Sequence, residues 1–512
     1  MPSFREAALT TLHQGHGCRI DAALQYIVQE RVEFSDAELV LRLFESAQDS
    51  SLRLAALIWM TKNKLFTQEL SDMTGFAPDA LATIPDHPPK VTLFPVVEPS
   101  GRASIARAIV YILPSVKLKA IALTGQGSSE CDHLSNLSGK SCLIGFDTAI
   151  EGSSWQLAAM AALLDKGEDP RVNIAFSGIV QPNGQITRAE GLPEKAACCK
   201  AQGLRLIYRV ANCSTLSKWL NGEIIPLPLV QYCGSPNELK RWQSLIETKV
   251  QETYEWFSYA DLEDWYGITS NDLAIHSIEG LRFEQAYWQD YLQTKVRDCF
   301  DNLEDKLSPK RALWFYAGQI GSLQFGIGAI FGFKRAIEIL QLDFSNSTYK
   351  PVFTLYGQNN ARELKNVSCS MEECQKVTGK LEVNSPESRE LALILYLGSH
   401  VLEGDVTEYC KEHLKLDNFL IIQAKHKQGV LDVNENWLPW AQEINSILNH
   451  ARKGHSWRRI HLFQTAPTAL CMALGIAIGH FLPIDIYHYQ YNAEHPKYRK
   501  VYSLDTILES RT

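Results

Sequence analysis

The sequence lacks the patterns that mark metal-binding, disulfide-bonded and membrane-spanning proteins. Its 12 cysteines include no C-x-x-C pair and no cluster spaced with histidines, so we expect no metal site, no disulfide framework and mostly buried, reduced thiols. The two longest apolar runs, 320–333 and 469–482, have about 14 residues each, fewer than the roughly 20 that a membrane helix needs. The segment Met1 to Glu6 has no apolar core before a small-residue cleavage site, which argues against secretion and predicts a cytoplasmic protein.

A strong charge of one sign and a complete phosphate-binding loop are also missing. The chain has 50 basic and 58 acidic residues and a formal net charge of -8, so we expect no binding to duplex nucleic acid through charge along the whole chain, and no membrane partner. Leu134 stands where G-x-x-x-x-G-K-[ST] requires a glycine before Gly139-Lys140-Ser141. ATP-driven unfolding is therefore not encoded.

The 512 residues, 45% of them hydrophobic, predict about three domains with ordinary cores and a multidomain α/β fold. Helical periodicity predicts a helical N-terminal domain over 1–88, with a proline-rich linker near its end. Alternating strands and helices predict an α+β domain over 91–232. Charged and aromatic helical segments over 233–310 indicate a connector. From 311 to 512 the order of strand, small-residue loop and helix recurs, which predicts two tandem half-domains with parallel sheets.

Two segments of the α+β domain carry residues that are able to do chemistry. Ser154 lies at a strand-to-helix junction, where unpaired backbone N–H groups can hold an oxyanion, although most serines at such positions only cap a helix. Lys195 lies where the second helix begins, and taken alone it is typical of a solvated surface lysine. A serine hydroxyl needs a base, and a lysine is that base only when desolvation or a neighbouring cation lowers its pKa. Leu192 and the run Ala196-Ala197-Cys198 supply apolar surroundings.

Three matching segments together resemble the proteolytic domain of Lon proteases. They are Gly152-Ser153-Ser154 before a small-residue helix, Phe176-Ser177-Gly178 followed by Pro182-Asn183-Gly184, and Gly191-Leu192-Pro193-Glu194-Lys195. The resemblance implies that Ser154 is the acylating nucleophile, that Lys195 is the general base and later acid, and that Ser177 orients the lysine amine. Backbone N–H groups at Ser154 and its neighbours would form the oxyanion hole.

The chain departs from the Lon pattern at four places around this dyad. Glu151 replaces the usual aspartate, Ser153 a common proline, and Glu190 a usual glycine, while Trp155-Gln156 replaces two small residues. None of these changes removes the dyad. We expect Trp155 to crowd or fill the floor of the cleft and so to affect substrate preference.

The C-terminal region resembles a SAVED domain, a sensor of two fused CARF-like units that binds cyclic oligonucleotides in CRISPR and related anti-phage systems. The resemblance is carried by 460–470, 473–475 and 484–489, which read as a strand, a small-residue loop, a Pro-led helix and an aromatic last strand. The first half, around 315–321, matches loosely.

Nucleotides dock at loops that follow the carboxyl ends of parallel strands, because helix N-termini there present N–H groups and a positive dipole to phosphates. This rule predicts a ligand face made of Gly318, Gln319, Gly398, Ser399, His400, Gln464, Thr465, Ala466 and Pro467. A basic run of Arg452, Lys453, His455, Arg458 and Arg459 is either near the phosphates or a solvated face. Trp437 either stacks an adenine or is buried.

The order of the two domains resembles the SAVED-containing Lon proteases of type III CRISPR defence. This implies an ATP-independent serine endopeptidase without a catalytic cofactor, activated by a cyclic oligoadenylate, with cyclic tetra-adenylate the expected ring. It also implies head-to-tail self-association through SAVED domains and cleavage of one specific partner protein. Two alternatives remain: a ligand-gated interaction or scaffold protein with a silent protease domain, and a nucleic-acid sensor with a helix-turn-helix near 67–76. The acidic balance counts against the second.

Overall fold

The computed structural model divides the chain into two compact units, Met1–Gly222 and Glu223–Thr512. It describes residues 3–14, 20–29, 31–98, 100–115, 117–124, 127–148, 150, 152–166, 173–221, 224–233, 235–277, 285–356, 361–365, 369–398, 403–425, 431–490 and 497–507. None of the helices in this part of the chain combines the length and the apolarity needed to cross a bilayer.

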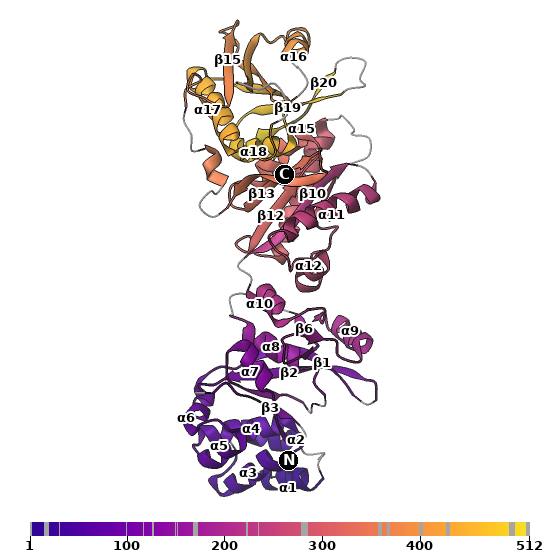
Figure 1. Ribbon diagram of the computed structural model, residues 1–512, viewed down its shortest axis with the longest axis vertical. Helices are drawn as coiled ribbons and strands as arrows, with labels where there is room; N and C mark the ends of the chain where they lie inside the picture. Colours follow the sequence, from indigo (N-terminus) through magenta and orange to yellow (C-terminus); the bar gives the residue numbers. More distant parts are fainter. Residues whose placement is uncertain are drawn as a thin grey trace. The chain divides into compact units, whose positions relative to one another are not determined.

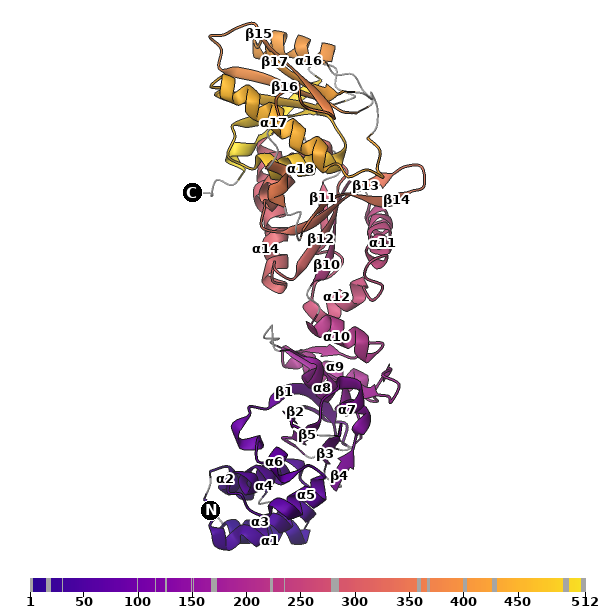
Figure 2. The same ribbon diagram turned by 60° about the vertical axis from the view of Figure 1, so that its left-hand side comes forward.

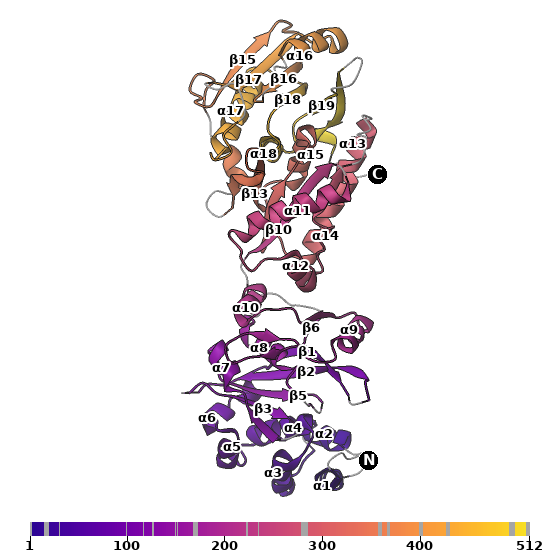
Figure 3. The same ribbon diagram turned by 45° about the vertical axis from the view of Figure 1, so that its right-hand side comes forward.

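Unit 1 is built on a seven-stranded mixed sheet in the order β4-β3-β5-β2-β1-β6-β9. Its strands are β1 (Lys90–Val97), β2 (Ala103–Ile112), β3 (Ala120–Thr124), β4 (Gly127–Glu130), β5 (Cys142–Phe146), β6 (Ile174–Phe176) and β9 (Arg205–Ile207). The helices that follow them are α7 (Asp132–Ser138), α8 (Gln156–Leu164), α9 (Leu192–Ala201) and α10 (Cys213–Asn221), and a small hairpin joins β7 (Ile179–Val180) to β8 (Ile186–Thr187). Figure 3 shows the sheet between two layers of helices, with α8 on one side and α4 on the other.

The N-terminal helices share their core with this sheet. They are α1 (Phe4–Gln14), α2 (Ile20–Val28), α3 (Ala37–Ser46), α4 (Ser50–Lys62), α5 (Thr67–Thr74) and α6 (Pro78–Leu81). Leu43, Phe44 and Leu57 belong to one buried cluster with Ile121 and Leu143 of the sheet. The helices therefore bury apolar surface against the sheet as well as against one another, which explains why the structure differs from the separate helical domain expected over 1–88.

The first half of unit 2 is a five-stranded sheet in the order β11-β10-β12-β13-β14, parallel except for β14. Its strands are β10 (Ile225–Cys233), β11 (Ala274–Ser277), β12 (Ala312–Ala317), β13 (Ala336–Asp343) and β14 (Thr348–Leu355). Figure 2 shows α11 (Pro236–Gln251) and α14 (Arg297–Lys306) on opposite faces of this sheet; α12 (Tyr259–Tyr266) and α13 (Gln285–Tyr291) come between them in the chain. Strand β10 thus lies inside the sheet, so the half-domain begins near 225 and not at 311, and the segment 233–310 is part of it.

The second half is a six-stranded sheet in the order β15-β17-β16-β18-β19-β20, with antiparallel strands at both edges. Its strands are β15 (Val377–Val383), β16 (Glu390–Tyr396), β17 (Asn418–Ala424), β18 (Arg459–Thr465), β19 (Ile484–Tyr489) and β20 (Tyr498–Ser503). Its helices are α16 (Glu403–Tyr409), α17 (Leu438–Gly454) and α18 (Thr468–Ile478), and α15 (Gly321–Phe331) is the matching helix of the first half.

The two halves repeat one backbone plan and join through α15 and α18, which Figure 1 shows side by side. Both helices end at a glycine in the same left-handed conformation, Gly332 (φ 68°, ψ -161°) and Gly479 (φ 67°, ψ -159°). The register of the following strand pair shifts at the same interval after each glycine. A Cβ on Gly328 would lie 2.3 Å from the carbonyl oxygen of Met472, and a Cβ on Gly475 would lie 2.4 Å from that of Phe325. The helices therefore touch backbone to backbone.

Candidate functional site

The loop between β5 and α8 positions Ser154. The carbonyl of Ser154 accepts a hydrogen bond from the N–H of Gly178 at 3.0 Å, and the N–H of Leu157 donates to the carbonyl of Gly178 at 3.2 Å. Gly152 adopts a φ of 78°, a conformation that favours glycine, two residues before Ser154. These bonds attach the loop of Ser154 to the segment Ser177-Gly178.

Lys195 comes from the first turn of α9 and points inward. The helix starts after Gly191, whose φ is 66°, and only 5% of Lys195 is exposed. Its Nζ donates a hydrogen bond of 3.3 Å to Oγ of Ser177, which is wholly buried. Burial lowers the pKa of the Lys195 amine, and the carboxylate of Glu190 acts in the opposite direction.

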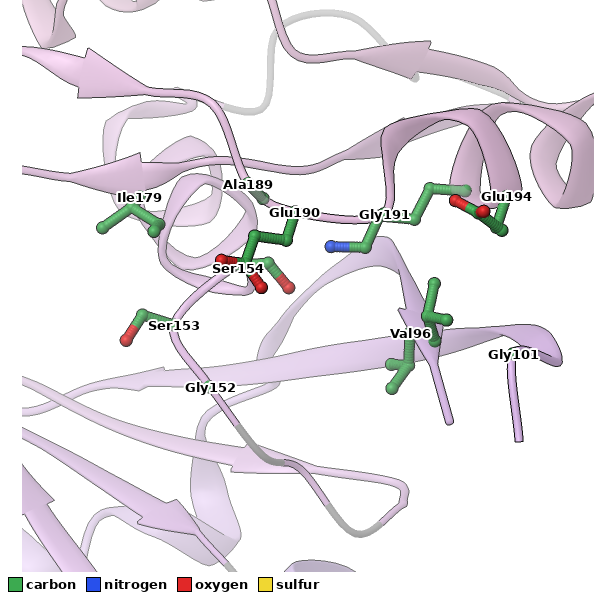
Figure 4. A pocket seen from close by; sticks show the side chains of 12 residues that line it. Val96, Gly101, Gly152, Ser153, Ser154, Ile179, Ala189, Glu190, Gly191 and Glu194 are labelled. Carbon is green, nitrogen blue, oxygen red and sulfur yellow. The ribbon is translucent and has the colours of Figure 1, made fainter. Parts of the chain in front are cut away.

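Ser154 and Lys195 line one cavity of about 570 Å³, which Figure 4 shows from close by. The structure thus brings together Ser154, Ser177 and Lys195, the three residues that the Lon resemblance implies. In the described part of the chain, the Lys195 side chain donates its hydrogen bond to Ser177 and not to Ser154.

We expected Trp155 to crowd or fill the floor of the cleft, but its side chain does not line the cavity. Its ring is buried, with its centroid 5.2 Å from that of Phe146, and its Nε1 donates to the carbonyl of Gly152 at 2.9 Å. The ring is absent from the cavity wall because it turns into the core under the loop of Ser154. The next residue, Gln156, accepts a hydrogen bond from the N–H of Val180 and so holds β7 beside α8.

Other walls of this cavity have no role assigned from the sequence pattern. Val96 and Val97 of β1 and Ile179 of β7 contribute apolar surface, and Glu190 and Glu194 contribute carboxylates. The β-branched residues gave no signal beyond strand propensity, because their approach to the dyad depends on tertiary pairing. Glu151, another departure from the Lon pattern, lies outside the described residues.

In unit 2 the loop after β12 is held by a buried glutamine. The side-chain oxygen of Gln231, in β10, accepts hydrogen bonds from the N–H groups of Gln319 and Ile320 at 2.9 and 3.2 Å. The Gln319 side chain accepts in turn from the N–H of Cys233 at 2.9 Å. Gly318 leaves room for the amide of Gln324, which would collide with a Cβ there. The loop is therefore preorganised, and no sequence pattern marks the role of Gln231.

The loops that follow β12, β16 and β18 meet at one place. Nε2 of Gln464 lies 2.7 Å from the position of a Cβ on Gly321. The carbonyl of Thr465 accepts from the N–H of Leu397 at 2.9 Å and lies 3.1 Å from the position of a Cβ on Gly398. Ala466 and Pro467 follow directly and lead into α18. Of the predicted ligand face, Ser399 and His400 lie outside the described residues.

A side chain of each half contacts the first turn of the other half's helix. Oγ of Ser322, in the first turn of α15, lies 2.7 Å from Nδ1 of His488 in β19. In the other half, the side-chain oxygen of Gln341 in β13 accepts from the N–H of Ala469 in α18 at 3.4 Å. Neither Gln341 nor His488 is recognisable from the sequence, because both contacts depend on how the two helices cross.

Two ligand hypotheses on the C-terminal half are wrong. Trp437 does not stack an adenine, since its side chain is fully buried and its Nε1 donates to the carbonyl of Asp432. The basic run ends at Arg459, the first residue of β18, whereas Thr465 is the last residue of that strand, so the run lies at the opposite end of the strand from the predicted ligand face. Arg459 binds Asp505 at 3.0 Å.

We expect unit 2 to lose stability in acid through His488. Burial lowers the pKa of His488 to about 4, below the value of about 6.5 for an unfolded chain. As the pH falls, the unfolded state therefore binds the proton before the folded state does. The contribution of neutral His488 to the free energy of unfolding is complete above about pH 6.5 and declines as the pH falls toward 4. This contribution amounts to at most about 3 kcal/mol. Urea unfolding of the full chain followed by tryptophan fluorescence should show this decline, and His488→Asn should flatten it. An equal decline in the variant would contradict the assignment.

Part of unit 2 matches a known protein family. Residues 297–504 match the family model of SAVED, described as the SMODS-associated and fused to various effectors sensor domain. The search of curated proteins returned no match. The match covers β12 to β20 and includes the loops at Gly318, Gly398 and Gln464.

Solved structures give weaker likenesses. The Acinetobacter baumannii Cap4 SAVED/CARF-domain containing receptor with the cyclic trinucleotide 2′3′3′-cAAA is 17% identical, with a TM-score of 0.35, over 57% of this chain and 53% of that receptor, about half its length. The same receptor with 3′3′3′-cAAA is 14% identical, with a TM-score of 0.36, over 61% of this chain and 74% of the receptor chain. The Moraxella osloensis Cap4 SAVED/CARF-domain containing receptor is 12% identical, with a TM-score of 0.30, over 62% of this chain and 73% of that receptor. Because these identities and TM-scores are low, the assignment rests on the family model: residues 297–504 form a SAVED sensor domain.

Proposed function

We propose that this protein is a serine peptidase with a Ser154–Lys195 dyad that is switched on when its SAVED domain binds a cyclic oligoadenylate. One observation carries the peptidase half of the proposal. A buried lysine amine, hydrogen-bonded to Ser177 and with a pKa lowered by burial, lines the same cavity as a serine at a helix N-terminus. A lysine in such surroundings is suited to act as a base.

The chemistry follows from the positions of these groups. The Lys195 amine takes the proton of Ser154 Oγ as that oxygen attacks a peptide carbonyl, and Ser177 keeps the amine in place by accepting one of its hydrogens. Among the described residues, the N–H groups of Ser153 and Ser154 have no backbone acceptor, so they are free to hold the oxyanion. Lys195 then gives the proton to the leaving amine, and water releases the acyl group.

The sensor half rests on the SAVED family match. The preorganised loops at Gly318, Gly398 and Gln464 adjoin helix N-termini, which suits a ligand with several phosphates. The ligand must bind one arrangement of the protein better than another in order to act as a switch. We propose that this arrangement is a self-associated one, and that the substrate is one partner protein, since the chain carries no complete phosphate loop for an unfolding motor.

The test is a cleavage assay with the full chain, candidate partner proteins and cyclic tri-, tetra- and hexa-adenylate in separate reactions. We expect cleavage of one partner with one ring size and none with Ser154→Ala. The matched control is Ser104→Ala, which removes the hydroxyl of an exposed serine on β2 that does not line the cavity and should keep activity within about twofold. Cleavage that persists in Ser154→Ala would contradict the assigned nucleophile.

A second candidate function is a ligand-gated docking protein with a silent protease domain. It is favoured by the Lys195 hydrogen bond, which goes to Ser177 rather than to the nucleophile. In this case Ser154→Ala would keep the protective effect of the protein against phage, whereas a peptidase would lose it. A phage plating assay with the wild type and this variant distinguishes the two.

A further inference from the structure

The cavity of the dyad has two carboxylates and an apolar wall, and this combination indicates what enters it. Glu190 lies just before α9 and Glu194 in its first turn, and both side chains are exposed at the cavity. Figure 4 shows Glu190 extending toward Ser154, while Glu194 lies on the side of Gly191 and Val96. Val96, Val97 and Ile179 provide the apolar wall.

We propose that this cavity selects a peptide with lysine or arginine at the residue whose carbonyl Ser154 attacks. This inference rests on the proposed peptidase function and adds the class of its substrate. The long side chains of lysine and arginine combine an apolar stem with a cationic head. The stem fits against Val96, Val97 and Ile179, and the head reaches the two carboxylates, which form charge-assisted hydrogen bonds with ammonium and guanidinium groups. An acidic side chain in the same place would meet like charges.

The same carboxylates create a difficulty for the base that a cationic substrate resolves. Lys195 acts only as the neutral amine, yet Glu190 favours its charged form. A cation that binds between Glu190 and Glu194 offsets their charge and repels the proton of Lys195. The correct substrate therefore promotes the deprotonation of the base as it binds, and a neutral substrate does not.

Other charged groups near α9 do not supply this effect. The elements packed against α9 are β1, β2 and β9, and their basic residues are Lys90, Arg107 and Arg205. None of the charged groups described on these strands or on α9 shifts the pKa of Lys195 by its charge, whereas Glu190, just before α9, does. The substrate cation thus offsets the charge of Glu190, the carboxylate that raises the pKa of Lys195. Glu194 is the second carboxylate that binds this cation.

The experiment compares two peptides that differ only at the attacked residue, lysine in one and norleucine in the other, so that the stem is kept and the charge removed. With the full chain and a mixture of cyclic tri-, tetra- and hexa-adenylate, we expect kcat/KM to favour the lysine peptide about tenfold. Glu194→Gln should reduce this ratio to about threefold, and Glu194→Lys should invert it. Glu69→Gln, an exposed glutamate on α5, is the matched control and should leave the ratio unchanged.

A pH profile supplies a readout that a merely structural glutamate would not move. The kcat for either peptide should rise with pH as Lys195 loses its proton, and the midpoint should lie lower for the lysine peptide. Equal midpoints together with equal kcat/KM values would overturn the inference.

Labelling of Ser154 with a fluorophosphonate separates this failure from failure of the proposed function. The label requires an activated serine and carries no peptide side chain. If Ser154 is labelled while the two peptides are cleaved equally, the substrate class is wrong and the peptidase stands. If Ser154 is not labelled under any condition, the peptidase function fails and the substrate class with it.

Discussion

Replacing Lys195 with arginine should slow the acylation of Ser154 about a thousandfold. The guanidinium is similar in length and still able to donate to Ser177, but it stays protonated at any pH at which a protein is folded. Burial lowers the pKa of the lysine in the same place, so the wild-type rate should rise with pH at lower values than a free lysine would give. The rate of fluorophosphonate labelling with activator present measures both effects.

The matched control is Lys200→Arg, an exposed position on the same helix. It should label at the wild-type rate. Thermal unfolding must show that Lys195→Arg is folded, since a large group in a buried position carries its own packing cost. A folded Lys195→Arg that labels normally would falsify the role of Lys195 as base and favour the docking alternative.

A single methyl group at Gly475 should destabilise unit 2 by about 3 kcal/mol or more, because the added carbon would lie 2.4 Å from the carbonyl oxygen of Phe325. Backbone atoms cannot move aside as a flexible side chain can, so α15 and α18 must separate. The loops that precede both helices, at Gly318 and Gln464, should lose their arrangement at the same time. Hydrogen exchange of the Gly475→Ala protein should therefore be faster across both helices, and binding of cyclic oligoadenylates should weaken.

Gly404→Ala provides the comparison, since it makes the same change on α16, where a Cβ meets no atom within 4 Å. It should leave exchange and binding unchanged, or improve stability slightly through helix propensity. If both variants behave alike, the close crossing of α15 and α18 does not set the stability of unit 2.

Patterns of alternating strands and helices located most of the second half of unit 2. The last strand of the pattern, 484–489, is β19 to the residue. The same pattern predicts strands over 391–396 and 460–463, and these are β16 and β18. The pattern also predicts a helix from the loop at 317–322 to Leu340, but the helix ends at Phe331, because Gly332 takes a backbone conformation that other residues rarely adopt. Hydrophobic periodicity thus predicts the start of this helix better than its end, which is set by a glycine.

Non-local pairing explains what could not be predicted. Strand β10 carries Pro226 and Pro228, which weaken its strand signal, and its neighbours β11 and β12 come much later in the chain. The residues of the dyad were identified through the Lon resemblance, whereas the cavity walls Val96 and Ile179 arise from β1 and β7, far apart in the sequence. In the sensor, Gln231 supports a loop that lies about ninety residues later.

The crossing of α15 and α18 also decides how this sensor can be divided or transferred. Every residue of α18 from Ala469 to Ile478 is buried, as are nine of the residues of α15. A gene fragment that encodes either half would expose to water the face by which its largely apolar helix packs on the other helix, and such a surface leads to aggregation. The smallest piece that evolution or a protein engineer can graft onto another effector is therefore the pair, including β10 from before the family match.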